Sequence, residues 1–194
     1  IVVIGDQGGV YGLDARSGEE RFRFAIRGWV PGNPVMLDMV RQRIIFGVRD
    51  GSLRTLHLGT GKTSVFFGRP GIPMCDALIA CGEERLIACS GNRIRNIDLG
   101  TGELLWEYVA SEERVCPPVV SERSVWILSA GGRLEEIDLA KGNRLAYFQS
   151  DLLRGGSAME YDRTSRRLLV AGEAGLLCLS RRLESRLFGD RAEK

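Results

Sequence analysis

The sequence predicts an all-β fold, a β-propeller of four-stranded blades with about four or five blades present. One observation is a motif that recurs along the chain, each time as a turn that closes on a glycine: LDARSGE at 13–19, LHLGTGK at 56–62, IDLGTGE at 97–103 and IDLAKGN at 137–143. Another is that successive motif glycines are 43, 41 and 40 residues apart, a period typical of propeller blades. A reactive loop has no reason to recur at one period, so the motif is structural.

The third observation is that the copies lie among the same kinds of short apolar run. Two runs joined by a glycine turn precede the motif, as in RIIFGV-RDG-SLRTLHL and SVWILS-AGG-RLEEIDL, and such pairs predict β-hairpins. A further run follows the motif glycine, as in ELLWEYV, and another follows a longer loop, as in PVMLDMV. The repeating unit is therefore four strands, and it predicts blades at about residues 1–27, 33–68, 74–109, 115–150 and 156–189.

The whole chain, residues 1–194, is expected to be a single propeller domain or a fragment of one. Its strands start at the second strand of the first blade and end in a fifth blade whose outer strand, ESRLF, is weak. This gives about 18 or 19 strands, whereas five closed blades would need about 20. We therefore expect an arc of a larger ring, of about seven or eight blades, rather than a small closed ring.

The turn motif contains residues that suit a tight connection between the third and fourth strands of a blade. Asp98 is expected to accept backbone N–H groups of the turn residues that follow it. Gly102 is expected to take the positive φ that closes the hairpin. Trp106 follows on the outer strand, where its large apolar area is expected to seal one blade against the next.

This motif resembles the tryptophan-docking motif of the PQQ-like, or quinoprotein-type, β-propeller repeat, Ala-x-Asp-x-x-Thr-Gly-x-x-x-Trp. Residues 96–106 match it in full except that Asn96 replaces Ala. The first copy has Phe22 at the Trp position, the second has His57 at the Asp position and Val65 at the Trp position, and the fourth lacks both Thr and Trp. The residues of the structural repeat motif are Asp14, Gly18, Gly61, Asp98, Thr101, Gly102, Trp106, Asp138 and Gly142.

The resemblance implies a function as well as a fold. Similar propellers serve as assembly factors in the bacterial envelope and as sensor domains of larger proteins. The resemblance therefore implies a non-catalytic scaffold that mediates protein–protein interaction, located in the bacterial periplasm or cell envelope. The alternative is a fragment of a quinone-dependent dehydrogenase, a class that holds pyrroloquinoline quinone (PQQ) and calcium at the centre of about eight blades.

The expected inner strands do not provide the ligands that this alternative needs. Calcium requires several convergent oxygen ligands. These strands contain only Asp38, Asp76 and Glu160, each at a different depth of its repeat. No cofactor, metal ligand or catalytic residue is therefore expected in this segment, and the ligands of a dehydrogenase would have to lie outside it.

Three other patterns are interpreted as structural. GTGKT at 59–63 resembles the end of a phosphate-binding P-loop, but Leu56 stands where the first glycine should be and a strand-like run follows. His57 is the only histidine and has no identifiable catalytic partner, so a turn or surface role is expected. Glu135 and Glu136 are neighbours on an expected strand and lie on opposite faces, so they cannot act as a paired acid and base.

Composition excludes several other classes of partner. The net charge is +2 and charged residues make up 27% of the chain, so no strong field recruits nucleic acid or a membrane. No apolar run approaches the ~18 residues of a membrane-spanning helix, so no membrane insertion of this segment is expected. The five cysteines lack metal-ligand spacing and are expected to be free thiols. Cys75 and Cys116, 41 residues apart at equivalent repeat positions, are the pair that a disulfide would most readily involve.

The arginines are the pattern that points to a partner. Of the 27 basic residues, only Lys62, Lys141 and Lys194 are lysines. One arginine lies in each expected loop from an outer strand to the next inner strand, and such loops share one face of a propeller. The candidate interaction rim consists of Arg27, Trp29, Arg69, Arg114 and Arg154. Guanidinium groups pair with carboxylates and Trp is enriched at interaction hot spots, so the expected partner is a protein or an acidic peptide.

Overall fold

The computed structural model describes residues 1–5, 7–27, 34–68, 75–173 and 175–180. These residues form five antiparallel sheets and one 3-10 helix, so the prediction of an all-β fold is confirmed. Trp29, Arg69 and the outer strand expected at 184–188 lie outside the described residues.

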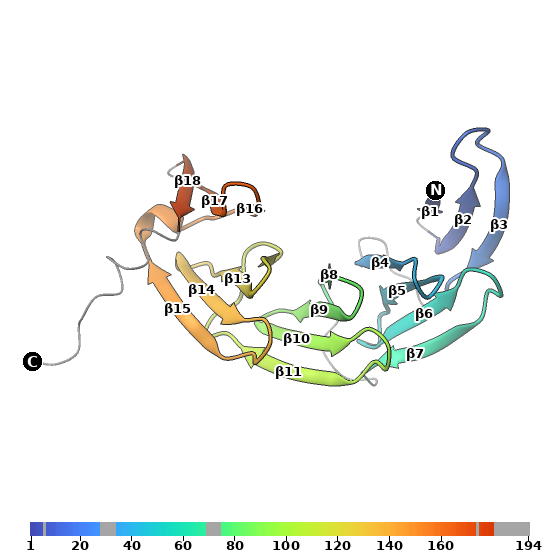
Figure 1. Cartoon of the computed structure of the whole chain (residues 1–194), viewed down its shortest axis with the longest axis horizontal. Coiled ribbons are helices and arrows are strands. Elements are labelled where there is room, and N and C mark those ends of the chain that lie inside the picture. Colours follow the sequence, from blue (N-terminus) through green and yellow to red (C-terminus); the bar gives the residue numbers. More distant parts are fainter. Residues whose placement is uncertain (6, 28–33, 69–74, 174, 181–194) are drawn as a thin grey trace, which may run out of the picture. The chain divides into compact units, whose positions relative to one another are not determined.

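The sheets follow one another along the chain, and each contains only consecutive strands (Figure 1). Sheet 1 consists of β1 (Val2–Ile4), β2 (Gly9–Leu13) and β3 (Glu20–Ala25). Sheet 2 consists of β4 (Val35–Asp38), β5 (Arg43–Gly47), β6 (Leu53–His57) and β7 (Thr63–Phe67). Sheet 3 consists of β8 (Ala77–Cys81), β9 (Arg85–Ser90), β10 (Arg93–Asp98) and β11 (Leu104–Val109).

The remaining two sheets continue the same order. Sheet 4 consists of β12 (Val119–Val120), β13 (Ser124–Leu128), β14 (Arg133–Asp138) and β15 (Arg144–Gln149). A 3-10 helix, η1 (Asp151–Leu153), leads to sheet 5, which consists of β16 (Ala158–Asp162), β17 (Arg167–Gly172) and β18 (Gly175–Ser180). In sheets 1 to 4, the turn motif lies at the end of the strand that corresponds to β10, namely β2, β6, β10 and β14.

The chain divides into two compact units. The first contains residues 1–91 and 95–105, and the second contains residues 92–94 and 106–194. The first unit therefore includes sheets 1 and 2 and part of sheet 3, and the second includes sheets 4 and 5. Within the described residues, no helix is long and apolar enough to cross a membrane.

Sheet 2 explains why the apolar runs are continuous rather than alternating. Successive residues of a strand point to opposite faces. On β5, Ile44 and Phe46 therefore enter a core shared with Val10 of sheet 1. Ile45 enters a second core, shared with Leu86 and other residues of sheet 3. Both faces of this strand are buried, which is why it reads as an unbroken apolar run.

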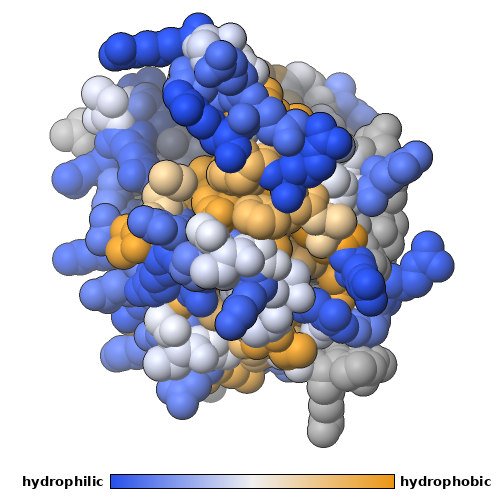
Figure 2. Space-filling model, turned by 90° about the vertical axis from the view of Figure 1, so that its right-hand side faces the viewer, coloured by the Kyte–Doolittle hydropathy of each residue, from blue (hydrophilic) through white to orange (hydrophobic). Residues whose placement is uncertain are grey.

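The second unit repeats this packing between sheets 4 and 5. Its core contains Leu128 and Leu134 from sheet 4, Leu168 and Val170 from sheet 5, and Leu153 from the connecting 3-10 helix. The surface of the chain is more mixed than these cores. Figure 2 shows the face at the right-hand side of Figure 1, where apolar side chains gather in the middle with hydrophilic side chains around them.

Candidate functional site

The motif aspartates organise the turns that join the third and fourth strands. The Asp98 carboxylate accepts hydrogen bonds from the backbone N–H of Gly100 (2.7 Å) and Thr101 (2.8 Å) and from the Thr101 hydroxyl (3.2 Å). Gly102 then takes a φ of 78° and donates its N–H to the Asp98 carbonyl oxygen (2.9 Å). The Thr101 N–H is the main reason why the pKa of Asp98 lies below its ordinary value.

Two further turns have the same geometry. Asp14 accepts the backbone N–H groups of Arg16 and Ser17, and Asp138 accepts those of Ala140 and Lys141. A hydrogen bond from Arg21 to Asp14, together with these N–H groups, lowers the pKa of Asp14 to about 2. The aspartates are therefore turn-forming groups, and their hydrogen-bonding capacity is used within the turns.

His57 performs the same task with a ring nitrogen. Its Nδ1 accepts the backbone N–H of Gly59 at 3.0 Å, and its carbonyl oxygen accepts the N–H of Gly61 at 2.8 Å. Gly61 has a φ of 67°, like the glycines of the other turns. The strand β7 follows directly, where a P-loop would begin a helix. The GTGKT stretch is a member of the turn series.

Each motif glycine after the first lies beneath an aromatic residue of the preceding sheet. A Cβ atom on Gly142 would come within 2.6 Å of the Trp106 indole, and one on Gly61 would come within 2.5 Å of the Phe24 ring. A Cβ on Gly102 would collide with the Phe66 carbonyl oxygen. These glycines therefore serve close packing between sheets as well as turn geometry.

The number of residues between the motif glycine and the aromatic residue that makes this contact differs from sheet to sheet. Trp106 stands at the expected position, is 9% exposed and donates its Nε1–H to the Leu139 carbonyl oxygen at 3.0 Å. In sheet 1 the residue over the glycine is Phe24, although the motif position is Phe22. In sheet 2 it is Phe66, whereas Val65 at the motif position is 62% exposed.

The carboxylates on the inner and middle strands have internal partners. Asp38 faces the guanidinium groups of Arg41 (3.4 Å) and Arg43 (3.0 Å), so its charge is already balanced. Glu135 accepts from Arg133 (3.0 Å) and Arg144 (3.2 Å). These carboxylates act as structural anchors rather than as a ligand set for a cation.

The other acidic residues from the sequence are dispersed. Asp76 accepts the N–H of Gly91 at 3.0 Å, and Glu160 is exposed on β16. Glu136 is buried and accepts a hydrogen bond from the Ser124 hydroxyl at 2.5 Å. Among the described residues, no group of three or more His, Cys, Asp or Glu side chains could hold a metal ion.

The described members of the candidate arginine rim have different environments. Arg27 is exposed in the turn after β3. Arg114 is half-buried and donates to the carbonyl oxygen of Cys116 at 2.9 Å. Arg154 is 63% exposed and pairs with Asp151 at 3.0 Å. Arg27 belongs to the first unit and the other two to the second. A rim that joins all of them stays a prediction.

The loop around Arg154 is built more firmly than an ordinary surface loop. Ser150 caps the 3-10 helix by accepting the Leu152 N–H at 3.2 Å. Leu153 is fully buried in the core between sheets 4 and 5. A Cβ on Gly156 would collide with the Leu128 side chain, so the loop closes tightly on the sheet. The loop is therefore held from both of its ends.

This rigid loop displays Leu152, which sequence reasoning missed. The Leu152 side chain is 53% exposed, while its neighbour Leu153 is fully buried. The signal was present in the pair of leucines in DLLRGG, because adjacent residues of a tight turn rarely bury both side chains. We call residues 150–156 the Leu152–Arg154 loop. It exposes an aliphatic side chain and, two residues later in the chain, a guanidinium group.

The repeated sheets and their aromatic–glycine contacts define a class of protein: a chain of PQQ-like propeller blades. The profile of a family described as outer membrane protein assembly factor BamB matches residues 1–182. The chain belongs to this family, as its resemblance to the PQQ-like repeat predicted. No curated protein matches the chain.

Solved structures support the fold. The crystal structure of BamB from Moraxella catarrhalis superimposes with a TM-score of 0.67 at 19% identity, over 94% of this chain and 55% of that one. The computationally designed Ika8 protein superimposes with a TM-score of 0.73 at 14% identity, over 92% of this chain and 54% of that one. The chain thus spans about half the length of the structures it matches.

Proposed function

We propose that this chain is part of a non-catalytic scaffold for the assembly of outer-membrane proteins in the bacterial cell envelope, and that it docks a protein partner through the Leu152–Arg154 loop. Membership of the BamB family supports the assembly role. The observation that carries the docking role is that one anchored loop exposes both Leu152 and Arg154, two residues apart in the chain.

The chemistry of the loop fits a protein segment with both apolar and acidic side chains. Leu152 offers apolar area that becomes buried on binding. Arg154 already pairs with Asp151, but both side chains are largely exposed, so a carboxylate of a partner can replace this weak surface pair. Because the loop is already ordered, binding costs little conformational entropy. The remaining rim positions, Arg27, Trp29, Arg69 and Arg114, are proposed as secondary contacts.

The test is complementation in cells of the source bacterium that lack the gene for this protein. The full-length protein with Leu152→Asp and Arg154→Ala should fail to restore the level of folded outer-membrane proteins, measured by their heat-dependent shift in gel mobility. The wild-type protein should restore it. A matched control is the pair Leu176→Ala and Arg163→Ala, which removes an exposed leucine and an exposed arginine elsewhere in the second unit.

Two results would contradict the proposal. Full restoration by the loop variant, at normal protein level, would show that the loop is not the docking site. Equal loss of function in the loop variant and the control would show a general surface or stability effect instead of docking.

A further inference from the structure

A second exposed feature lies in the first unit, at the turn between β4 and β5. Leu37, Met39 and Val40 are exposed to 44%, 64% and 61%. Asp38, between them in sequence, is only 6% exposed. The usual pattern is thus inverted, with apolar side chains outside and a carboxylate inside. A buried charge together with an exposed apolar group is the informative departure from ordinary surface composition.

Ion pairs of the buried Asp38 carboxylate with two partly buried arginines fix the orientation of this turn. The Asp38 carboxylate accepts the backbone N–H of Arg41 at 3.2 Å and pairs with the side chains of Arg41 and Arg43. The Arg41 guanidinium also donates to the carbonyl oxygen of Glu83, and the Arg43 guanidinium to that of Leu99, both in turns that connect strands of sheet 3. The charged side chains therefore hold the turn against sheet 3.

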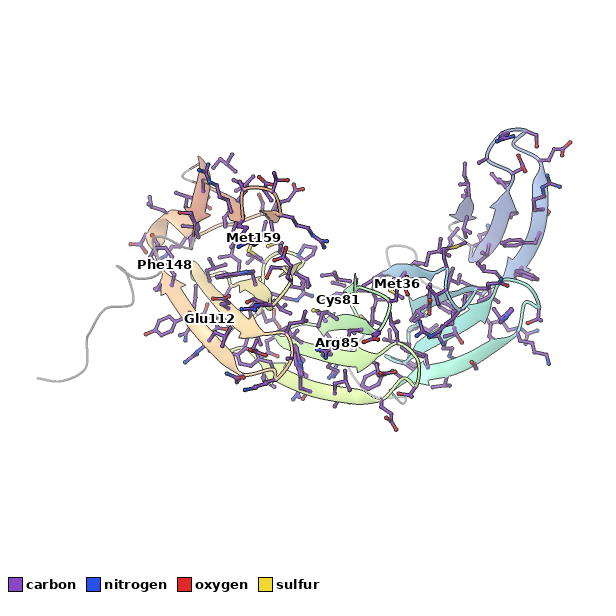
Figure 3. All side chains as sticks on the ribbon, viewed as in Figure 1. Met36, Cys81, Arg85, Glu112, Phe148 and Met159 are labelled. Carbon is purple, nitrogen blue, oxygen red and sulfur yellow. The ribbon has the colours of Figure 1, made fainter. Side chains whose placement is uncertain are left out.

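Met36, two residues before Asp38, anchors the same face of β4. Met36, labelled in Figure 3, lies on β4 in the core between sheets 2 and 3, with Ile45 of β5 and Leu86 of β9. Because successive residues of a strand alternate in direction, Leu37 points away from this core. Leu37, Met39 and Val40, which we call the apolar tip, are held outside on a fixed support.

The repeat provides a direct comparison for this turn. The equivalent turn of sheet 5 has the same length and the same ends: Asp38 and Arg43 are register partners in sheet 2, and Asp162 and Arg167 are register partners in sheet 5. Asp162 accepts the N–H of Ser165, the third residue after it, as Asp38 accepts that of Arg41.

In both turns, the residue with a positive φ also stands at the same position, four residues after the aspartate. Gln42 has a φ of 48°, and its counterpart Arg166 has a φ of 53°. The two turns therefore share one backbone design. In the sheet 5 turn, the positions of Met39 and Val40 are occupied by the exposed polar residues Arg163 and Thr164. The fold thus does not require apolar residues there.

The two other turns of this kind are also polar. They consist of Gly82, Glu83 and Glu84 in sheet 3, and of Ser121, Glu122 and Arg123 in sheet 4. All four turns lie in the described part of the chain, and only the sheet 2 turn carries apolar side chains at its tip. Because neither folding nor solubility explains them, the apolar side chains point to binding.

Charge decides which kind of partner fits. The turn and its neighbour in sheet 3 contain three carboxylates and three guanidinium groups, which cancel: Asp38, Glu83, Glu84, Arg41, Arg43 and Arg85. An anionic membrane surface attracts clusters of basic residues and aromatic anchors, and the tip has neither. The exposed carboxylates of Glu83 and Glu84 would repel such a surface. A methionine beside a β-branched residue instead suits an apolar pocket of a protein.

We propose that the apolar tip inserts into an uncharged, apolar pocket of a protein partner and forms a docking point separate from the Leu152–Arg154 loop. Its binding depends on apolar burial, so salt has little effect on it. Binding at the Leu152–Arg154 loop, in contrast, weakens with salt because a guanidinium group takes part.

The first experiment identifies the partner by site-specific photo-crosslinking from the apolar tip. The full-length protein is produced in its own cells with a photo-crosslinking amino acid at position 39 or, as the matched control, at position 163. The expected result is a discrete protein adduct from position 39 that position 163 does not give. Identical adducts from both positions, or an adduct to lipid from position 39, would overturn the proposal.

The second experiment measures binding of the purified partner to the wild-type protein and to three double variants. Met39→Arg with Val40→Thr gives the sheet 2 turn the first two residues of the sheet 5 turn, and Met39→Gln with Val40→Thr removes the apolar groups without adding charge. Both should weaken binding at least about tenfold, equally at about 0.05 M and about 0.5 M salt, with an unchanged unfolding midpoint. Arg163→Met with Thr164→Val should leave binding unchanged.

The remaining outcomes separate the alternatives. Unchanged binding by both tip variants would overturn the proposal. It would also be overturned if the protein sediments with vesicles of phosphatidylethanolamine and phosphatidylglycerol and the tip variants do not. A protein with Leu152→Asp and Arg154→Ala should still crosslink from position 39, so failure of the Leu152–Arg154 loop is distinguishable from failure of the tip.

Discussion

The indole nitrogen of Trp106 donates a hydrogen bond to the carbonyl oxygen of Leu139, 3.0 Å away and 33 residues further along the chain. The same indole covers Gly142, at the far side of the turn that contains Leu139. Trp106 lies on β11 and the turn follows β14, so one side chain joins sheet 3 to the motif of sheet 4. The motif of one blade is thus the docking platform for the aromatic residue of the blade before it.

Trp106→Ala should destabilise the fold by roughly 3–5 kcal/mol, the range for truncating a buried aromatic residue. Trp106→Phe should cost less, because it keeps most of the apolar area and loses the hydrogen bond to Leu139. Chemical denaturation of the three proteins measures both effects. A midpoint that does not change for Trp106→Ala would show that the indole does not stabilise this junction.

Gly142→Ala and Gly18→Ala separate backbone strain from packing between sheets. Both glycines have a φ of 74°, so an alanine at either position adopts an unfavourable left-handed conformation, which costs about 1 kcal/mol. A Cβ at Gly18 meets nothing within 4 Å, whereas one at Gly142 collides with Trp106. Gly142→Ala should therefore cost about 1–3 kcal/mol more. Equal losses in denaturation would contradict the aromatic–glycine contact.

Stability should fall in acid because of the turn aspartates. The pKa values of Asp14, Asp98 and Asp162 lie below the ordinary value of 3.8, with that of Asp14 at about 2. Each carboxylate thus contributes stability that is present above its unfolded-state pKa and is lost as the pH falls through its folded-state pKa. The denaturation midpoint should decline between about pH 5 and about pH 2. Replacing the three aspartates by asparagine should reduce this decline. The prediction would be wrong if the denaturation midpoint of the variant fell with pH as steeply as that of the wild-type protein.

The five cysteines should titrate as five free thiols in the denatured, non-reduced protein, since all five are free in the structure. In the folded protein, Cys178 is exposed and should react first with a thiol reagent. Cys89 and Cys116 should react slowly, because burial shields them and raises the pKa of both thiols. A count of three after denaturation would reveal a disulfide and contradict the prediction.

The sequence by itself determined the repeating unit. Short apolar runs, turn glycines and the spacing of the Asp–Gly motif predicted antiparallel sheets of the PQQ-like type, and this architecture is confirmed. These features are local: a hairpin and its hydrogen bonds depend on residues within about ten positions of one another. For the same reason, the position of His57 in the motif predicts a turn or surface role, and its Nδ1 accepts a hydrogen bond within the turn.

Only the tertiary structure decided which side chains meet between sheets. The motif spacing pointed to Phe22 and Val65, but Phe24 and Phe66 cover the next glycines. The pairing of both outer strands contains a register irregularity, which the spacing of motif residues does not reveal. Likewise, Leu152 and Met39 are apolar residues in polar surroundings, and sequence alone does not tell a buried leucine from an exposed one. Their exposure follows from the anchoring of Leu153 and Asp38, whose contacts lie in other strands and sheets and therefore exist only once the chain has folded.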